Sequence, residues 1–339
     1  MPSPHTPLPG TAGPGTPMPP GEVSSALASS VPSHADGALL LDYLCARFPY
    51  LARERWRDEI AGGNVLVGGE RAQATRRLRR GDVVSYLRPD PEPWVDDRVP
   101  TLYEDAALLA VDKPAHLPMH ADGPFRRSTL VHLLQSRRAE PALGPCHRLD
   151  RETSGVALFA RRPDVRRILQ RDFEAGAVAK TYLAVVRGAV AADFTVDAPV
   201  GHAVGSKVAL RRACGTGCAD PKPASTRFDV VRRGEKNTLL RATPATGRTH
   251  QIRAHLEHAG HPIVGDKLYG RRDDDFLAFV ALAKRTGDAR NWRDGGPDRQ
   301  LLHAESLAFR HPSDGRPCTV TSPMPTSFEE WLDRSTAAP

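Results

Sequence analysis

The chain has 339 residues, 40% of them hydrophobic and 26% charged, which is enough for one large or two ordinary domains with a sizeable core. A small scaffold that depends on disulfide bonds is excluded, and no stretch reaches the roughly 20 apolar residues that a membrane-spanning helix needs. The sequence does not open with a basic segment followed by an apolar run, and its five cysteines are scattered. We therefore expect a cytoplasmic protein that does not contact a membrane.

The charge balance is basic, and arginine dominates it. Lysine and arginine total 47 against 40 acidic residues, which gives a formal net charge of +7. Only seven of these basic residues are lysine, and a planar guanidinium matches phosphate oxygens better than an ammonium group does. The balance favours a polyanionic partner, although a codon bias toward arginine would produce the same composition.

Composition divides the chain into five parts. Residues 1–36 contain nine prolines and four glycines, and we expect a disordered tail there because they bring too little apolar area to offset ordering the backbone. Residues 37–90 are predicted to form a small α/β module, 91–100 a linker, 101–330 a second and larger domain, and 331–339 a C-terminal tail.

The module of residues 37–90 is predicted to contain two short helices and a small sheet. Amphipathic patterns place the helices at 39–44 and 56–60, and valines alternate at 65–67 before a Gly-Gly turn. The arrangement resembles the S4-like RNA-binding module, which implies a basic surface that faces RNA. The arginines expected to contact phosphates, although a solvated helix face would look the same, are Arg53, Arg55, Arg57, Arg76 and Arg77.

The larger domain is predicted to be α+β, with helices flanking a mixed but mainly antiparallel sheet. Short apolar runs predict strands at 108–112, 156–160 and 181–186, and helical spacing predicts a helix at 164–175. Two hairpins are expected, joining 228–231 to 238–242 and 306–309 to 318–321. Hairpins rather than crossovers favour antiparallel pairing. Residues 211–221 and 271–300 are expected to be inserted surface loops.

The stretch from His147 to Gly155 has the clearest chemical content. Asp150 lies there between Arg148 and Arg151, just ahead of a predicted buried strand. Neighbouring positive charge keeps such a carboxylate ionised, as a nucleophile or a base requires. A surface ion pair fits the same residues, so this stretch alone leaves both interpretations open.

Four blocks, in the same order, resemble the pseudouridine synthases related to the ribosomal large-subunit enzyme RluA. The blocks are Asp112 to Ala115, His147 to Gly155, Lys180 to Gly188, and Thr246 to Leu256 with its continuation to Gly270. The resemblance covers residues 100–325. It implies the pseudouridine synthase fold and isomerisation of uridine to pseudouridine in structured ribosomal or transfer RNA. The N1–C1′ bond breaks and C5 rejoins C1′, without metal or other cofactor.

The resemblance also implies residue roles. Asp150 matches the essential aspartate, which either attacks the sugar or removes a proton from C2′, and Arg253 matches its basic partner. Tyr182 matches the aromatic residue that stacks on the base, although a half-buried strand tyrosine would look the same. We expect Thr249 to cap the helix that carries Arg253. The residues expected to bind substrate are Arg148, Arg151, Thr153, Arg248 and His250.

Two other functions stay open. A glycoside hydrolase would need a second carboxylate about 5–9.5 Å from Asp150, and Glu152 is near in sequence. An RNA-binding chaperone with an inactive catalytic domain is the other alternative, but the three expected catalytic residues are all present. We expect a monomer. The predicted helix spreads four histidines over different faces, which argues against a metal site: His250, His255, His258 and His261.

Overall fold

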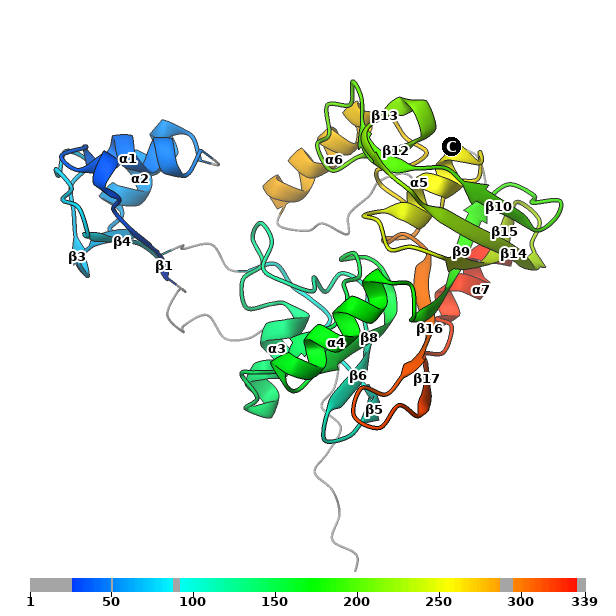
Figure 1. Ribbon diagram of the computed structural model, residues 1–339. Coiled ribbons are helices and arrows are strands. Elements are labelled where there is room, and N and C mark those ends of the chain that lie inside the picture. The colour runs from blue at the N-terminus through cyan, green and yellow to red at the C-terminus, as the bar shows by residue number, and fades with distance from the viewer. Residues whose placement is uncertain (1–25, 50, 88–91, 287–294, 334–339) are drawn as a thin grey trace, which may run out of the picture. The chain divides into compact units, whose positions relative to one another are not determined.

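The computed structural model describes residues 26–49, 51–87, 92–286 and 295–333. The chain divides into two compact units between Pro91 and Glu92. Each unit has its own sheet and core, and each is coloured by residue number in Figure 1. In the described part of the chain, no helix combines the length and apolar character needed to cross a bilayer.

The first unit is a four-stranded antiparallel sheet with two helices, and its strand order is β1-β4-β2-β3. Its elements are β1 (Ala26–Ser30), the 3-10 helix η1 (Ser33–Ala35), α1 (Leu40–Arg47), α2 (Arg53–Ala61), β2 (Val65–Val67), β3 (Glu70–Arg71) and β4 (Val83–Leu87). Apolar positions of the helices and strands meet in one core, where Leu40, Trp56 and Val65 are fully buried. The two short helices that the sequence predicts therefore form.

This unit begins earlier than composition predicts. Strand β1 pairs along its length with β4, Ser30 lying opposite Val83, and Val31 is buried. The prediction of a disordered tail is therefore wrong for residues 26–36. Backbone pairing with a strand some 50 positions away orders the segment, and composition does not report such pairing. Residues 1–25 of the predicted tail lie outside the described residues.

The second unit is built on a ten-stranded sheet whose path is β10-β14-β15-β9-β16-β8-β6-β5, with β17 on β16 and β7 on β8. The elements of its first half are β5 (Thr101–Glu104), β6 (Leu108–Lys113), α3 (Leu130–Arg138), β7 (Gly144–Pro145), β8 (Ser154–Ala160), α4 (Pro163–Glu174), β9 (Ala179–Arg187) and β10 (Phe194–Asp197). Those of the second half are β11 (Val200–Ala203), β12 (Arg212–Cys214), the 3-10 helix η2 (Gly215–Gly217), β13 (Cys218–Lys222), β14 (Ser225–Arg233), β15 (Asn237–Pro244), α5 (Gln251–His258), α6 (Asp273–Thr286), β16 (Leu302–Arg310), β17 (Pro317–Thr321) and α7 (Thr326–Asp333).

Pairing in this sheet is antiparallel between the described strands, except that β16 runs parallel to β8. The two predicted hairpins form, one from β14 and β15 and the other from β16 and β17. The predicted α+β class with a mainly antiparallel sheet is confirmed.

Strand β8 is buried on both faces, because a helix packs on each side of it. Val156 and Leu158 belong to the same apolar cluster as Leu169 of α4. The alternate residue Phe159 packs instead in a cluster with Leu134 of α3. Side chains alternate across a strand, so α3 and α4 cover opposite faces of the sheet. Both helices are seen beside β6 and β8 in Figure 1.

The described parts of two segments expected to be surface loops contain regular secondary structure. Within 271–300, helix α6 begins with Asp273, and its acidic first turn suits the positive end of the helix dipole. Phe276 on α6 packs against the apolar cluster of Val208, Ala254, Leu268 and Tyr269, and Phe279 is buried. Within 211–221, β12 and β13 flank β11 in a small sheet. Apolar anchoring orders α6, while residues 287–294 lie outside the described residues.

Strand β16 lies between β8 and β9 and fixes the start of β8 relative to Tyr182. Its Ala304 pairs with Gly155 at the start of β8 and with Tyr182 on β9. Gly155 has a φ of +106°, and a Cβ there would lie 2.2 Å from the carbonyl oxygen of Ala304. Only glycine fits this approach. The loop that carries Asp150 therefore enters the sheet two strands away from Tyr182.

Candidate active site

A buried lysine forms hydrogen bonds with the backbone of the loop that carries Asp150. Lys113 has no exposed surface, and its ammonium group donates to the carbonyl oxygens of Pro114 and Leu117 at 2.8 Å and of Arg151 at 3.0 Å. The N–H of Thr153 donates to the carbonyl oxygen of Asp150 at 3.1 Å. The carboxylate thus projects from a backbone turn that is fixed on both sides.

Arg253 bridges two carboxylates. Its Nη1 donates to Asp150 Oδ2 at 2.8 Å, and its Nε and Nη2 donate to Asp266 Oδ2 and Oδ1 at 2.7 and 3.0 Å. The Asp266 side chain is fully buried and also accepts the backbone N–H groups of Leu268 and Tyr269. Asp266 therefore sets the orientation of the guanidinium that meets Asp150, as a bidentate pair does.

Electrostatics keep Asp150 ionised. Burial by itself would raise its pKa, but electrostatic interactions with His250, Arg253 and Arg148 and the hydrogen bond from Arg253 outweigh burial. The pKa of Asp150 consequently lies below its usual value, and the group is a carboxylate at neutral pH. About a quarter of the side chain, 24%, is exposed, which leaves one side open to a substrate.

Tyr182 provides an uncharged aromatic ring on β9. Burial, and then the negative charge of Asp150, raise the pKa of its phenol, so the hydroxyl keeps its proton across the physiological range. The ring is half-buried and packs against the apolar clusters on both sides of β9. The structure thus brings together the three residues expected to be catalytic.

His250 lies beside Asp150 in an unusual backbone conformation. Its φ is +57°, and it directly precedes α5, which begins at Gln251. The prediction that Thr249 caps this helix is therefore wrong, because His250 occupies the N-cap position and no side-chain hydrogen bond caps the helix there. Burial, followed by the charge of Arg253, lowers the pKa of His250 to about 4.

The other residues expected to bind substrate divide into three groups. Arg148 and Arg248 are exposed. Arg151 is half-buried, and its guanidinium contacts Glu152 at 3.2 Å. Thr153 is buried, and its hydroxyl accepts the Gln300 side-chain N–H at 2.8 Å. Thr153 thus stabilises the turn that follows Asp150, and the structure does not support its expected contact with substrate.

The expected RNA-binding arginines of the first unit are all exposed. Arg53 forms an ion pair with Asp42 at 2.7 Å, and Arg55 forms one with Glu59 at 2.8 Å. Arg77 donates to the carbonyl oxygen of Gly37 at 2.9 Å.

Sequence reasoning missed several residues of the site. Asp266 and Tyr269 lie in the continuation of the fourth block, from Gly265 to Gly270, which was noted but given no role. The signal was an acid and a tyrosine shortly after a helix that carries a buried arginine. Lys113, in the first block, was likewise unassigned. Each acts through a partner distant in sequence, and a single sequence does not identify that partner.

Glu152, the acid next to the turn, forms a buried pair. It accepts from Lys267 Nζ at 2.8 Å, and the two side chains are 10% and 5% exposed. Burial alone would raise the pKa of Glu152, but the charges of Lys267 and Arg151 lower it from 4.5 to about 2. The resulting stabilisation of the fold is complete above pH 4.5 and is lost as the pH falls toward 2.

Glu152→Gln is therefore expected to lower the free energy of unfolding by about 3 kcal/mol at neutral pH, because it leaves the Lys267 ammonium buried without its counter-ion. Urea unfolding should show a deficit smaller by about 1 kcal/mol near pH 3.5, where unfolded glutamate is largely protonated. An equal deficit at both pH values would contradict this explanation.

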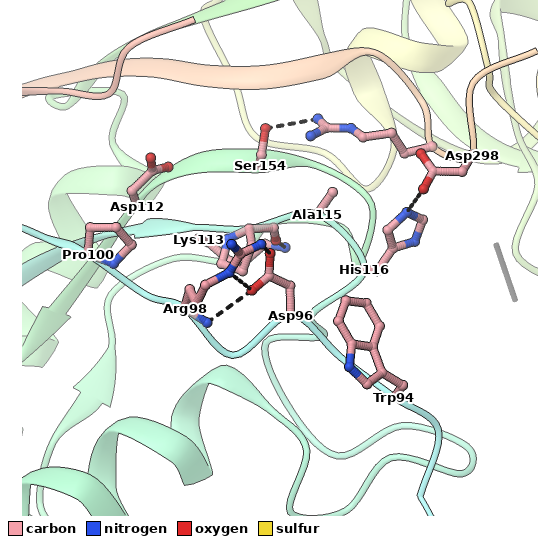
Figure 2. Close-up of a pocket in the computed structure, with 12 residues that line it drawn as sticks. Trp94, Asp96, Arg98, Pro100, Asp112, Lys113, Ala115, His116, Ser154 and Asp298 are labelled. Atoms are coloured by element: carbon pink, nitrogen blue, oxygen red, sulfur yellow. Dashed lines mark hydrogen bonds and ion pairs between the residues drawn. The ribbon is translucent and has the colours of Figure 1, made fainter. Parts of the chain in front are cut away.

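A hollow of about 580 Å³ lies elsewhere in the second unit (Figure 2). Ser154 is among its lining residues, but Asp150, Tyr182 and Arg253 are not. Two pairs of its side chains contact each other, since Arg98 lies 2.7 Å from Asp96 and His116 lies 3.3 Å from Asp298, as the dashed lines show. The three residues expected to be catalytic therefore lie outside the lining of this hollow.

Comparisons with known proteins point to one family. A family model described as RNA pseudouridylate synthase matches residues 107–258. The ribosomal large subunit pseudouridine synthase D of Xanthomonas campestris pv. campestris is 35% identical over 91% of this chain and 92% of that protein. The mitochondrial tRNA pseudouridine(32) synthase of Saccharomyces cerevisiae is 31% identical over 86% of this chain and 66% of that protein.

The solved structures give the same result. Human RNA pseudouridylate synthase domain containing 1 aligns with a TM-score of 0.55 and 28% identity, over 72% of this chain and 89% of that one. The segment that the family model matches includes Asp150, Tyr182 and Arg253.

Proposed function

Because this chain belongs to the RluA-type family of RNA pseudouridine synthases, we propose that Asp150 is its catalytic carboxylate and that Tyr182 and Arg253 serve it. The observation that carries the proposal is the 2.8 Å contact between Arg253 and Asp150 beside a half-buried tyrosine ring. The chain is an RNA pseudouridine synthase, and its cytoplasmic location and monomeric state stay predictions.

The reaction needs an ionised acid at the sugar. The N1–C1′ bond breaks, the uracil turns, C5 bonds to C1′, the hydrogen on C5 leaves as a proton, and N1 takes up a proton. Asp150 either attacks C1′ or removes the proton from C2′, and both routes require the carboxylate that the neighbouring cations maintain. The neutral ring of Tyr182 offers a stacking surface for the detached uracil.

The chemistry of a glycoside hydrolase is poorly supported. Such an enzyme needs a second carboxyl group that protonates the leaving group. Glu152 is paired with Lys267 and has its pKa lowered to about 2, which suits a permanent anion and not an acid. Asp266 is fully buried against Arg253. Neither group is available to donate a proton.

We propose that the substrate uridine lies in a loop or bulge of ribosomal or transfer RNA. A base must leave its stack to reach Asp150, and this costs less outside a continuous duplex. The relatives named above act on one or the other of these RNAs, as their names state. Arg148 and Arg248 are exposed, and we propose that they contact the phosphates.

Mapping pseudouridines chemically across total RNA tests this function. Cells that lack the gene should lose one or more modified sites, and the wild-type gene should restore them, whereas a gene encoding Asp150→Asn should not. An unchanged map would contradict the proposal.

The first unit is proposed to add affinity without affecting the chemical step. Arg57→Ala and Arg76→Ala should each weaken RNA binding several-fold and reduce the slope of log affinity against log salt by about one, because each exposed guanidinium releases counterions from phosphate. Filter binding across a salt series measures both effects. Arg53→Ala is the matched control, since that guanidinium is already paired with Asp42. A slope unchanged in the first two variants would count against RNA contact by this surface.

A further inference from the structure

His250 stands between the catalytic carboxylate and a buried tyrosine, and each ring nitrogen faces a different neighbour. Nδ1 lies 3.0 Å from the Tyr269 hydroxyl, and Nε2 lies 3.8 Å from Asp150 Oδ2. We propose that His250 is a positioning residue, held as the tautomer with its proton on Nε2, and that it shares Oδ2 with Arg253 so that Oδ1 meets the nucleoside. This inference rests on the catalytic role proposed for Asp150.

The hydrogen bonds behind the ring assign the proton. The backbone N–H of Arg212 donates to the Tyr269 hydroxyl oxygen at 3.0 Å. That hydroxyl has one proton of its own, and among the described residues only Nδ1 of His250 lies where it can accept it, at 3.0 Å. With Nδ1 as the acceptor, the single N–H of a neutral imidazole lies on Nε2.

The carboxylate favours the same tautomer. With its proton on Nδ1, the ring would direct the Nε2 lone pair at Asp150 Oδ2, which is unfavourable at 3.8 Å. Burial lowers the pKa of His250 to about 4, so the ring is neutral at neutral pH and acts through its N–H dipole. Two independent neighbours therefore select one form of the ring.

The backbone is held in an unfavourable conformation to aim this side chain. A φ of +57° is uncommon for a residue with a Cβ, and such outliers gather at functional sites. Tyr269 contacts both partners of Asp150, since its ring lies edge-on to His250 at 5.7 Å and beneath the Arg253 guanidinium at 4.8 Å. One buried side chain thus supports the two groups that approach Oδ2.

The consequence for Asp150 is an asymmetry between its oxygens. Arg253 Nη1 donates to Oδ2 at 2.8 Å and His250 Nε2 faces the same atom, whereas no described residue donates a hydrogen bond to Oδ1. The reactive oxygen is then Oδ1. The titratable groups around the pair are Arg253 on α5, Asp266 and Tyr269 after it, Arg212 on β12, Tyr182 on β9, and Lys113 and Arg148.

The tautomer can be read directly by NMR, independently of activity. Protein labelled with ¹⁵N in its histidine rings should show, for His250 at neutral pH, the two-bond ¹H–¹⁵N pattern of the Nε2–H form, assigned by its absence in His250→Gln. Tyr269→Phe removes the hydroxyl that Nδ1 accepts from, so a share of the Nδ1–H form should appear there, smaller than that of the Nε2–H form, which Asp150 still favours. A wild-type ring that is charged or carries its proton on Nδ1 would overturn the proposal.

Kinetics test the effect on Asp150. In single-turnover reactions, His250→Ala should lower the rate about ten-fold and move the acid limb of the pH profile upward by roughly one unit, because Asp150 loses the N–H dipole, 3.8 Å from Oδ2, that favours its charged form. His250→Gln, whose amide can place an N–H near the position of Nε2, should keep the limb near its wild-type position. A slower His250→Ala enzyme with an unmoved limb would indicate a purely structural role and overturn the inference. Failure of the proposed function itself would appear separately, as activity in Asp150→Asn.

Discussion

Asp150→Asn is expected to abolish pseudouridine formation, lowering the single-turnover rate by at least about a thousand-fold. Asparagine keeps the size of the side chain, and its carbonyl can still accept from Arg253, but it has no charge with which to attack C1′ or take the C2′ proton. Release of tritium from C5-labelled uridine in RNA measures the reaction. RNA affinity should stay within about two-fold of wild type, because phosphate contacts supply most of it.

Asp112→Asn is the matched control for this variant. Asp112 is a half-buried carboxyl on β6, and burial raises its pKa. It makes no contact with Asp150 and is expected to tolerate the loss of its charge. Release of tritium by Asp150→Asn at a rate near that of Asp112→Asn would show that the carboxylate at position 150 is not the catalytic group.

Elements that depend on local pattern were predictable from the sequence. The apolar runs at 108–112 and 156–160 form β6 and β8, because a short run of consecutive apolar residues is itself the signal of a buried strand. Strand β1 and helix α6 were not predictable in this way. β1 is ordered by the backbone of Val83–Leu87, and α6 is anchored through Phe276, which packs against Ala254 and Leu268, and neither partnership has a local signal.

The same distinction applies to the site. The contact between Asp150 and Arg253 was expected only because a family pattern links two blocks that lie 103 positions apart. The residues next to Thr153 in the sequence predicted that it would contact substrate. Its hydroxyl instead accepts a hydrogen bond from Gln300, 147 positions away. Asp266 is only 13 positions from Arg253, but the turn after α5 decides whether the two meet. Side-chain partners of this kind follow from tertiary structure.

Arg253→Met is expected to cost both activity and stability, because one guanidinium serves two carboxylates. Removing it leaves the fully buried Asp266 without its counter-ion and Asp150 without its strongest hydrogen bond. We expect the free energy of unfolding to fall by roughly 3–5 kcal/mol at neutral pH. The rate should fall by about a hundred-fold or more, since the carboxylate loses its orientation.

The pH dependence of this loss follows from Asp150. In the wild type its pKa is depressed on folding, so its contribution to stability is present above the unfolded pKa and is lost as the pH falls through the folded one. Without Arg253, burial becomes dominant and raises the pKa of Asp150. The deficit measured by urea unfolding should therefore shrink between pH 7.5 and pH 5.

A second substitution separates the two roles of Arg253. Adding Asp266→Asn to Arg253→Met removes the uncompensated buried charge, so the double variant should recover part of the stability while staying inactive. Arg241→Met is the matched control, because Arg241 makes a similar bidentate pair with Glu305 but is 44% exposed, and it should cost less than about 1 kcal/mol. A double variant no more stable than Arg253→Met would show that Asp266 is not held by the arginine in the way that the geometry indicates.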